Sequence, residues 1–212
     1  MKHISRASCG LVLCTSVALS ACQTPVDNAA GRPTAYVDVG DPGMVSGVGI
    51  ESQDIVGMTD KMMRDMLSNP TVAGATTPPR VIVDSEHFAN ESSQRINKNL
   101  IVDRLRVELA RAANGRMMFV AREHAGMVAQ ERDLKRAGYV DVATTGLARA
   151  QAGADYRLTG RITSLDGLDR SSGTAQRYNL ITFEMIDLET GLIVWTNSYE
   201  FKKAAQDDVI YR

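Results

Sequence analysis

The side chains that most often carry catalysis are sparse in this sequence, and their spacing supports no reaction. His124 has Glu123 beside it and Glu131 further along, but adjacent residues of a helix point in different directions, so these groups do not form a metal cluster. His87, the other histidine outside the N-terminal leader, stands alone after a predicted strand. Neither the GxSxG nor the SxxK serine-nucleophile signature is present. We therefore expect no catalytic residues, no metal site and no cofactor.

The composition is that of a folded protein with no sign of nucleic-acid binding. Hydrophobic residues make up 44% and charged residues 23% of the 212 positions, which is enough apolar material for the core of one domain. The 24 basic and 25 acidic side chains give a net charge of −1, and this balance gives no reason to expect a nucleic-acid partner. No stretch has the roughly 18 consecutive apolar residues of a membrane-spanning helix.

The first 22 residues form a targeting signal that ends in a lipid attachment site. Lys2 and Arg6 precede an apolar run over residues 11–19, and the leader closes on Leu19-Ser20-Ala21-Cys22. This tetrapeptide resembles the lipobox of bacterial lipoproteins, in which diacylglycerol is attached to the cysteine sulfur and the chain is cleaved just before it. We therefore expect residues 1–21 to be a signal peptide and Cys22 to be lipidated. A plain signal peptide with an unmodified cysteine is the alternative.

Cleavage before Cys22 would leave a mature chain whose only thiol carries lipid. Cys9 and Cys14 lie within the leader, so this processing excludes disulfides, thiolate metal sites and a cysteine nucleophile. Two or more acyl chains give stable membrane attachment where one does not. Gln23 follows the cysteine. By resemblance to the sorting rule of proteobacterial lipoproteins, the absence of Asp there favours the outer membrane, with the protein on its periplasmic side.

Residues 22–49 are rich in proline and glycine and have no periodic apolar residues. This composition predicts a flexible tether between the lipid and a globular domain over residues 50–212. Helical spacing predicts the first helix of that domain, from an N-cap at Ser52 to a stop at Asn69-Pro70. Its core face carries a stripe of methionines, Met58, Met62 and Met66.

The middle of the domain is predicted to alternate between helices and strands. A loop over residues 71–79 leads to a buried strand at 80–84. A helix over 94–113 stops at Asn114-Gly115, and its core face is formed by Ile96, Leu100, Ile101, Leu105 and Leu109. A strand at 117–120 precedes a third helix at 124–137 and a short fourth helix at 144–152. The residues expected to face inward on the third helix are Met127, Val128 and Leu134.

From Tyr156 onward the apolar period changes from that of a helix to that of a strand. Strands are predicted at 156–162, 178–186 and 192–201, joined by a long polar loop over 166–175 and by a tight turn at Glu189-Thr190-Gly191. Trp195 is expected in the core. The whole pattern predicts an α/β fold, in which a mixed sheet with flanking helices ends in a C-terminal antiparallel meander.

Three stretches in this order resemble a known family. They are RVIVDS from Arg80, ADYRLTG from Ala154 and LETGLIVW from Leu188. With the lipobox and the segment Met58-Thr-Asp-Lys-Met62, they resemble the LpoB family of penicillin-binding protein activators over about residues 50–202. The resemblance implies a domain related to the amino-terminal domain of TolB, without an active site.

The same resemblance implies a partner and a location. The partner is a bifunctional class A penicillin-binding protein, a peptidoglycan synthase of the inner membrane. The lipoprotein reaches it from the outer membrane through the peptidoglycan and stimulates it. This chain departs from the enterobacterial members in its shorter tether.

A second class of protein carries similar motifs, namely the subunits of curli-type lipoprotein secretion complexes. Such a subunit needs alternating segments of about ten residues that cross the membrane as hairpins. Residues 166–175 and their neighbours are too short and too polar to supply such segments. This difference favours the activator.

Alternation along the meander predicts where a partner docks. Because Tyr156, Leu158 and Ile162 face one side of their strand, the residues between them face the other side. Helices should bury the apolar side and leave a flat polar patch, and arginines on such a patch often anchor interfaces. The residues expected there are Arg157, Thr159, Arg161, Thr182, Glu184 and Thr196. An ordinary solvated sheet face is the alternative.

Overall fold

The computed structural model describes residues 35–39, 47–144 and 146–206. The chain divides into two compact units, residues 1–38 and 39–212. In the first unit, residues 35–38 are exposed and belong to no helix or strand. The expected signal peptide, Cys22 and most of the expected tether lie outside the described residues. Within the described ranges, no helix combines the length and the apolar character needed to span a membrane.

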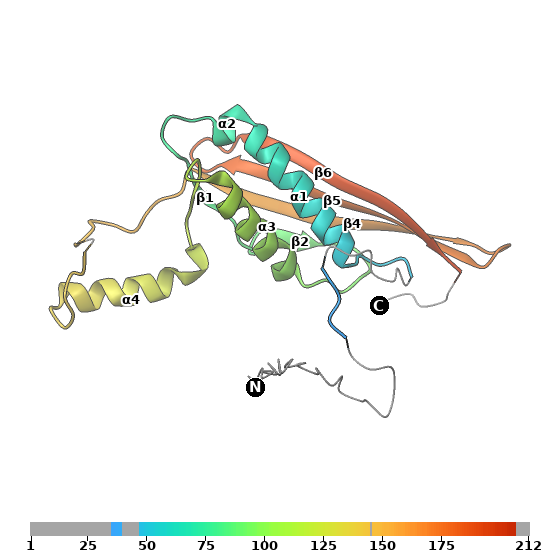
Figure 1. The fold of residues 1–212 in the computed structure, drawn as a ribbon, viewed down its shortest axis with the longest axis horizontal. Coiled ribbons are helices and arrows are strands. Elements are labelled where there is room, and N and C mark those ends of the chain that lie inside the picture. Colours follow the sequence, from blue (N-terminus) through green and yellow to red (C-terminus); the bar gives the residue numbers. More distant parts are fainter. Residues whose placement is uncertain (1–34, 40–46, 145, 207–212) are drawn as a thin grey trace, which may run out of the picture. The chain divides into compact units, whose positions relative to one another are not determined.

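The second unit is built on one mixed sheet of six strands (Figure 1). Its strands are β1 (Arg80–Ile82), β2 (Phe88–Asn90), β3 (Met118–Phe119), β4 (Tyr156–Asp169), β5 (Thr174–Asp187) and β6 (Ile193–Ala205). The order is β3-β1-β4-β5-β6, with β2 also paired to β4. The pairs that involve β1, β2 or β3 are parallel, and β4, β5 and β6 form antiparallel hairpins. The predicted α/β class, with a mixed sheet and a C-terminal meander, is confirmed.

Two helices pack on one face of this sheet, α1 (Ser52–Ser68) and α3 (Lys98–Ala113) (Figure 1). The predicted methionine stripe of α1 is completely buried there. The residues buried in the same core from the strands, and from Val83 just after β1, are Val81, Val83, Phe88, Leu158, Ile162, Ile181, Phe183, Met185 and Trp195. Each large apolar side chain contributes about 1.5–3 kcal/mol on burial, so this shared core holds both helices to the apolar face.

The N-terminus of α1 is fixed by a capping box, and its N-cap lies one residue before the predicted one. The N-cap is Glu51 rather than Ser52, because the Asp54 carboxylate accepts the Glu51 N–H at 2.8 Å. Lys203 of β6 donates to Asp54 at 2.7 Å and ties this helix start to the sheet. Val48 is only 3% exposed, so the folded domain begins before residue 50 and takes the last residues of the predicted tether.

Asparagine side chains set two further boundaries that differ from the prediction. Asn69 accepts the Thr71 N–H at 2.9 Å and caps a short helix, α2 (Pro70–Ala73), where only a loop was expected. Asn97 caps α3 in the same way, so this helix starts four residues later than predicted, at Lys98 rather than residue 94. Leu100, expected in the core, is 57% exposed.

The hairpin that joins β4 to β5 is longer than predicted. Residues 166–175, expected as a loop, are mostly strand, with Asp166 paired to Arg177 and Leu168 paired to Ala175. An ion pair between Asp166 and Arg177 crosses this hairpin. Polar residues here form cross-strand contacts instead of a loop, and only residues 170–173 turn.

The segment after β3 differs most from the prediction. The 3₁₀ helix η1 (Arg122–His124) leads into α4 (Ala125–Arg136), which contains no buried residue. Met127 is 65% exposed, and Val128 and Leu134 are exposed as well, so the prediction that they face inward is wrong. Residues 144 and 146–152 are not helical. The helical spacing is real, but α4 stands apart from α1 and α3 (Figure 1), so its apolar side chains do not reach the core.

A substitution at Gly160 tests the packing of the core directly. A methyl group there would lie 2.8 Å from the Thr182 carbonyl oxygen and even closer to the ring of Phe88, which packs against Phe183 with ring centroids 5.4 Å apart. Gly160→Ala should lower the free energy of unfolding by about 1–3 kcal/mol through overpacking. Gly167→Ala, on the same strand with nothing within 4 Å, is the control and should be neutral in denaturant unfolding. Equal stability of the two variants would contradict this packing.

Candidate partner-binding surface

The face of the meander opposite α1 and α3 carries the predicted polar patch. Strand register places Thr159, Glu184 and Thr196 in one row across β4, β5 and β6, and Arg161 beside Thr182 in the next row. These five residues line one shallow hollow of about 460 Å³, together with His87 and Ala89 at the β2 edge and with Gly160, Thr163 and Leu180. We call this hollow and its lining residues the open-face patch.

The threonines of the open-face patch are held by the strands beneath them. Thr159 donates its hydroxyl to the Glu184 carbonyl at 3.4 Å, and Thr196 donates to the Phe183 carbonyl at 3.1 Å. Each hydroxyl oxygen keeps lone pairs that can accept a further hydrogen bond. The patch therefore presents acceptors in fixed positions.

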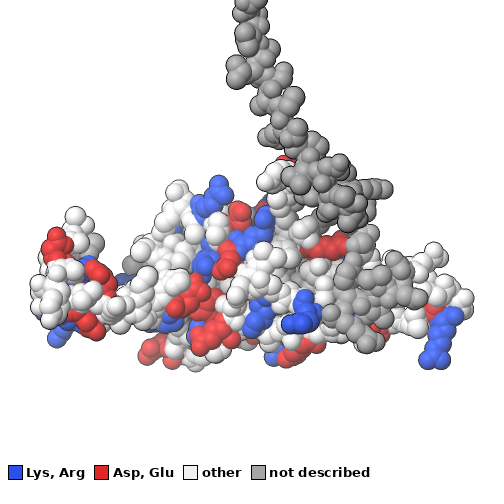
Figure 2. Space-filling view, turned by 90° about the horizontal axis from the view of Figure 1, so that it is seen from below, with Lys and Arg blue, Asp and Glu red and all other residues white. Residues whose placement is uncertain are grey.

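The charges of the open-face patch are of both signs. Arg161 is 60% exposed at its side chain and lies 3.5 Å from the Glu91 carboxylate. Glu184 is half-buried, and no cation of the described residues forms a salt bridge with it. An exposed pair such as Arg161–Glu91 contributes at most about 1 kcal/mol, so Arg161 can exchange this contact for a partner. Figure 2, which views another side of the domain, also shows basic and acidic side chains interspersed.

Arg157, the sixth predicted residue, is already engaged. Its guanidinium donates to both oxygens of Asp84, at 2.8 and 3.1 Å, and to Glu86. The Arg157 side chain is only 15% exposed and that of Asp84 only 7%. Asp84 lies two residues after β1, whose Ile82 pairs with Arg157, so this ion pair joins the parallel and antiparallel parts of the sheet. The structure thus brings five of the six predicted residues together in one hollow and gives Arg157 a structural contact.

Two carboxylates order the turns at the ends of the hairpins. The hydroxyls of Ser171 and Ser172 lower the pKa of Asp169 to about 2, and the backbone N–H groups of Thr190 and its neighbour hold the pKa of Asp187 below its usual range. A carboxylate with a lowered pKa stabilises the fold above its unfolded pKa and loses this contribution as pH falls through the folded value. Both carboxylates are therefore ionised at neutral pH and accept the hydrogen bonds of their turns there.

The remaining candidate groups for chemistry are scattered. His124 is exposed and lies 3.5 Å from Glu123, whereas Glu131 lies 3.7 Å from Lys135. In the parts of the chain that the structure covers, no three His, Cys, Asp or Glu side chains are arranged to hold a metal ion. The open-face patch has hydrogen-bonding groups of both kinds, and its arrangement suits binding.

The fold is that of a two-layer α/β domain in which α1 and α3 cover one face of the sheet and leave the other uncovered. The family model described as peptidoglycan-synthase activator LpoB matches residues 54–201, which include both helices of the core and all strands up to β6. The chain belongs to the LpoB family of peptidoglycan-synthase activators. The resemblance noted from the sequence is thereby confirmed.

Solved structures with detectable similarity are distant. The LpoB C-terminal domain from Salmonella enterica has 20% identity and a TM-score of 0.41, over 70% of this chain and 98% of that chain. Lipoprotein GNA1162 from Neisseria meningitidis has 16% identity and a TM-score of 0.31, over 61% and 86% of the two chains. The PelC dodecamer from Paraburkholderia phytofirmans has 13% identity and a TM-score of 0.31, over 59% and 71%. No curated protein matches the sequence.

Sequence reasoning missed three contributors to this region. Strand β2 was not predicted, although its Ala89 and the preceding His87 line the open-face patch. Asp84 and Glu86 were not connected to Arg157, because they are distant in sequence and meet only through the β1–β4 pairing. The signal available in the sequence was Asp84, the single acidic residue of the strand motif RVIVDS.

Substitutions of Arg157 and Arg161, the two arginines of β4, should differ in their effect on stability. Arg157→Ala leaves Asp84 buried without its partner, and breaking a buried ion pair costs about 3 kcal/mol, so its unfolding midpoint should fall clearly. Arg161→Ala removes an exposed side chain and should change stability by less than about 0.5 kcal/mol. Denaturant unfolding of the two variants side by side checks this difference. A stable Arg157→Ala variant would show that the ion pair is dispensable.

Proposed function

We propose that the protein is an outer-membrane lipoprotein that binds and stimulates a bifunctional class A penicillin-binding protein and so regulates peptidoglycan synthesis. The observation that carries this proposal is the match to the family of peptidoglycan-synthase activators over residues 54–201. That match also favours the activator over a subunit of a curli-type secretion complex. The family is regulatory, and the proposal requires no catalysis by this chain.

The proposed anchor and tether set how the domain reaches its partner. Lipidation of Cys22 would hold the chain at the outer membrane. Residues 22–46 would then span about 25–30 Å as a random coil and at most about 90 Å when stretched. This reach lets the domain extend away from the outer membrane toward a synthase anchored in the inner membrane.

The open-face patch is the proposed docking surface for the synthase. Arg161 and Glu184 supply exchangeable charges of opposite sign, and Thr159, Thr182 and Thr196 supply acceptors held in register. The patch lies on strands that are rigidly backed by the core, so docking there requires little reordering of the domain. Arg157 is left out of this set because its charge is neutralised by Asp84.

Paired substitutions test this surface without disturbing the core. Arg161→Ala/Glu184→Ala should weaken synthase binding by roughly 1–3 kcal/mol, as expected for interface anchors. The matched control, Arg111→Ala/Glu108→Ala, removes the same two charges from α3 and should act like the parent. The measurement is glycan polymerisation by purified synthase at limiting activator, with unfolding curves for both variants. If both pairs stimulate the synthase equally, the docking surface lies elsewhere.

A further inference from the structure

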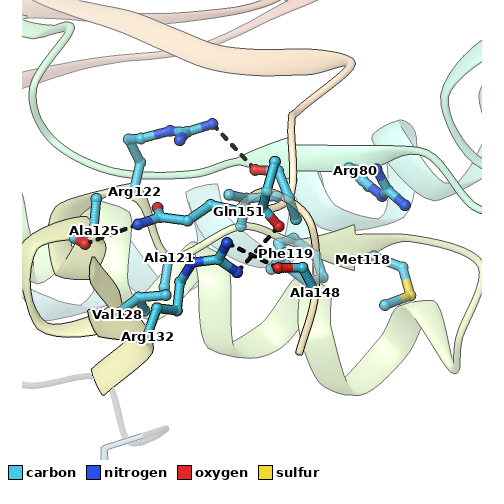
Figure 3. Close-up of a pocket in the computed structure, with 13 residues that line it drawn as sticks. Arg80, Met118, Phe119, Ala121, Arg122, Ala125, Val128, Arg132, Ala148 and Gln151 are labelled. Atoms are coloured by element: carbon cyan, nitrogen blue, oxygen red, sulfur yellow. Dashed lines mark hydrogen bonds between the residues drawn. The ribbon is translucent and has the colours of Figure 1, made fainter. Parts of the chain in front are cut away.

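A second hollow lies beside β3, the strand at one edge of the sheet. It has a volume of about 340 Å³ and lies between the end of β3, the start of α4 and residues 148–152 (Figure 3). We call it the edge groove. It shares no lining residue with the open-face patch, and nothing proposed above uses it.

On one side of β3, no described strand pairs with its backbone. The N–H of Met118 donates to the Pro79 carbonyl at 2.8 Å, and the N–H of Val120 donates to the Val81 carbonyl at 2.9 Å. These two groups therefore point toward β1, and in a strand the N–H and C=O of Phe119 between them point the other way. β3 is the last strand in the sheet order, and no described residue forms a hydrogen bond with these two Phe119 groups, so they lie at the sheet edge as an available donor and acceptor.

The lining of the edge groove is apolar except for three arginines and Gln151. Its apolar residues are Met118, Phe119, Val120, Ala121, Ala125, Val128, Ala148, Ala150 and Ala152. The charged residues of the lining are Arg80, Arg122 and Arg132, and no acidic residue joins them. Five of the apolar residues are alanines, so the groove accepts inserted side chains without large groups in the way.

The arginines of the edge groove are positioned but not neutralised. Arg132 donates to the Ala150 carbonyl at 3.2 Å and to the Ala148 carbonyl at 3.0 Å, and Arg122 donates to the Ala152 carbonyl at 3.5 Å (Figure 3). Carbonyl oxygens orient a guanidinium but leave its charge in place. Among the described residues, no carboxylate forms a salt bridge with any of these three arginines. The groove therefore favours a ligand that carries negative charge.

We propose that the edge groove binds an extended peptide segment of a partner protein, which adds to β3 as a new strand. Strand addition satisfies the free N–H and C=O of Phe119, and alternate side chains of the peptide enter the groove. The peptide carries small or medium apolar residues at those positions and a carboxylate beside the arginines. A volume of about 340 Å³ lies at the low end for binding pockets and suits a short segment. This site is independent of the proposed synthase activation.

Selection from a displayed library of random eight-residue peptides tests the proposal. The bait is the chain from Gln23 to Arg212, and bound peptides are then measured by fluorescence anisotropy. Enriched peptides should alternate apolar residues and contain an acidic residue or depend on a free C-terminus. N-methylation of the peptide amides that face β3 should abolish binding, whereas N-methylation of the amides that face away should not.

Two variants and their controls locate the site. Ala150→Trp fills the edge groove and should weaken binding at least tenfold, whereas Ala204→Trp, an exposed alanine on β6, should not. Arg80→Gln/Arg122→Gln should weaken binding about fivefold and reduce its salt dependence, whereas Arg111→Gln/Arg170→Gln should not. A library that yields no binder, or binders that are indifferent to Ala150→Trp, would overturn the proposal. So would a selection dominated by sequences of this chain, since that would assign the groove to a second copy.

Discussion

The alternation of side chains along β5 is the constraint on which the rest of the domain depends. Ile181, Phe183 and Met185 are completely buried, and the residues between them, Thr182 and Glu184, face the opposite side. A shift of one residue in the pairing would exchange the two faces. The long hairpins with β4 and β6 hold the register, so the helices cover one face and the other stays polar and open.

Two ion pairs add to the connections that the apolar core makes across this sheet. Arg157 and Asp84 connect the parallel strand β1 to the meander, and Arg177 with Asp166 closes the long hairpin between β4 and β5. Such pairs are costly to break once one partner is removed. Two arginines that lie four residues apart on β4 therefore differ in their contacts: Arg157 is held in a buried ion pair with Asp84, whereas Arg161 has only an exposed contact with Glu91 and is the one proposed to bind the partner.

Much of the fold follows from local patterns in the sequence, and the exceptions have physical reasons. The methionine stripe, the C-terminal alternation and the turn at Gly191 are confirmed because each is encoded by neighbouring residues. The prediction that one face of α4 is buried was wrong. Helical spacing shows which side chains share a face, but it does not show whether another element packs against that face. The prediction of a loop at 166–175 was wrong because its polar residues pair across a hairpin.

The candidate site was predictable only as a set of residues on one face. Strand alternation placed five residues of the open-face patch together, but the contact between Arg157 and Asp84 depends on the β1–β4 pairing, which has no local signal. The edge groove could not be predicted, because it combines the open edge of β3 with residues 148–152, which were expected to be helical.

The account rests on the claim that the open sheet face, and not the helical layer, contacts the synthase. Cross-linking in living cells tests this claim most directly, with a photoreactive amino acid placed at Thr182 or, for comparison, at Arg64, an exposed position on α1. We predict that Thr182 cross-links to a class A penicillin-binding protein, identified by labelled penicillin, and that Arg64 does not. Cross-linking from Arg64 without cross-linking from Thr182 would contradict the account.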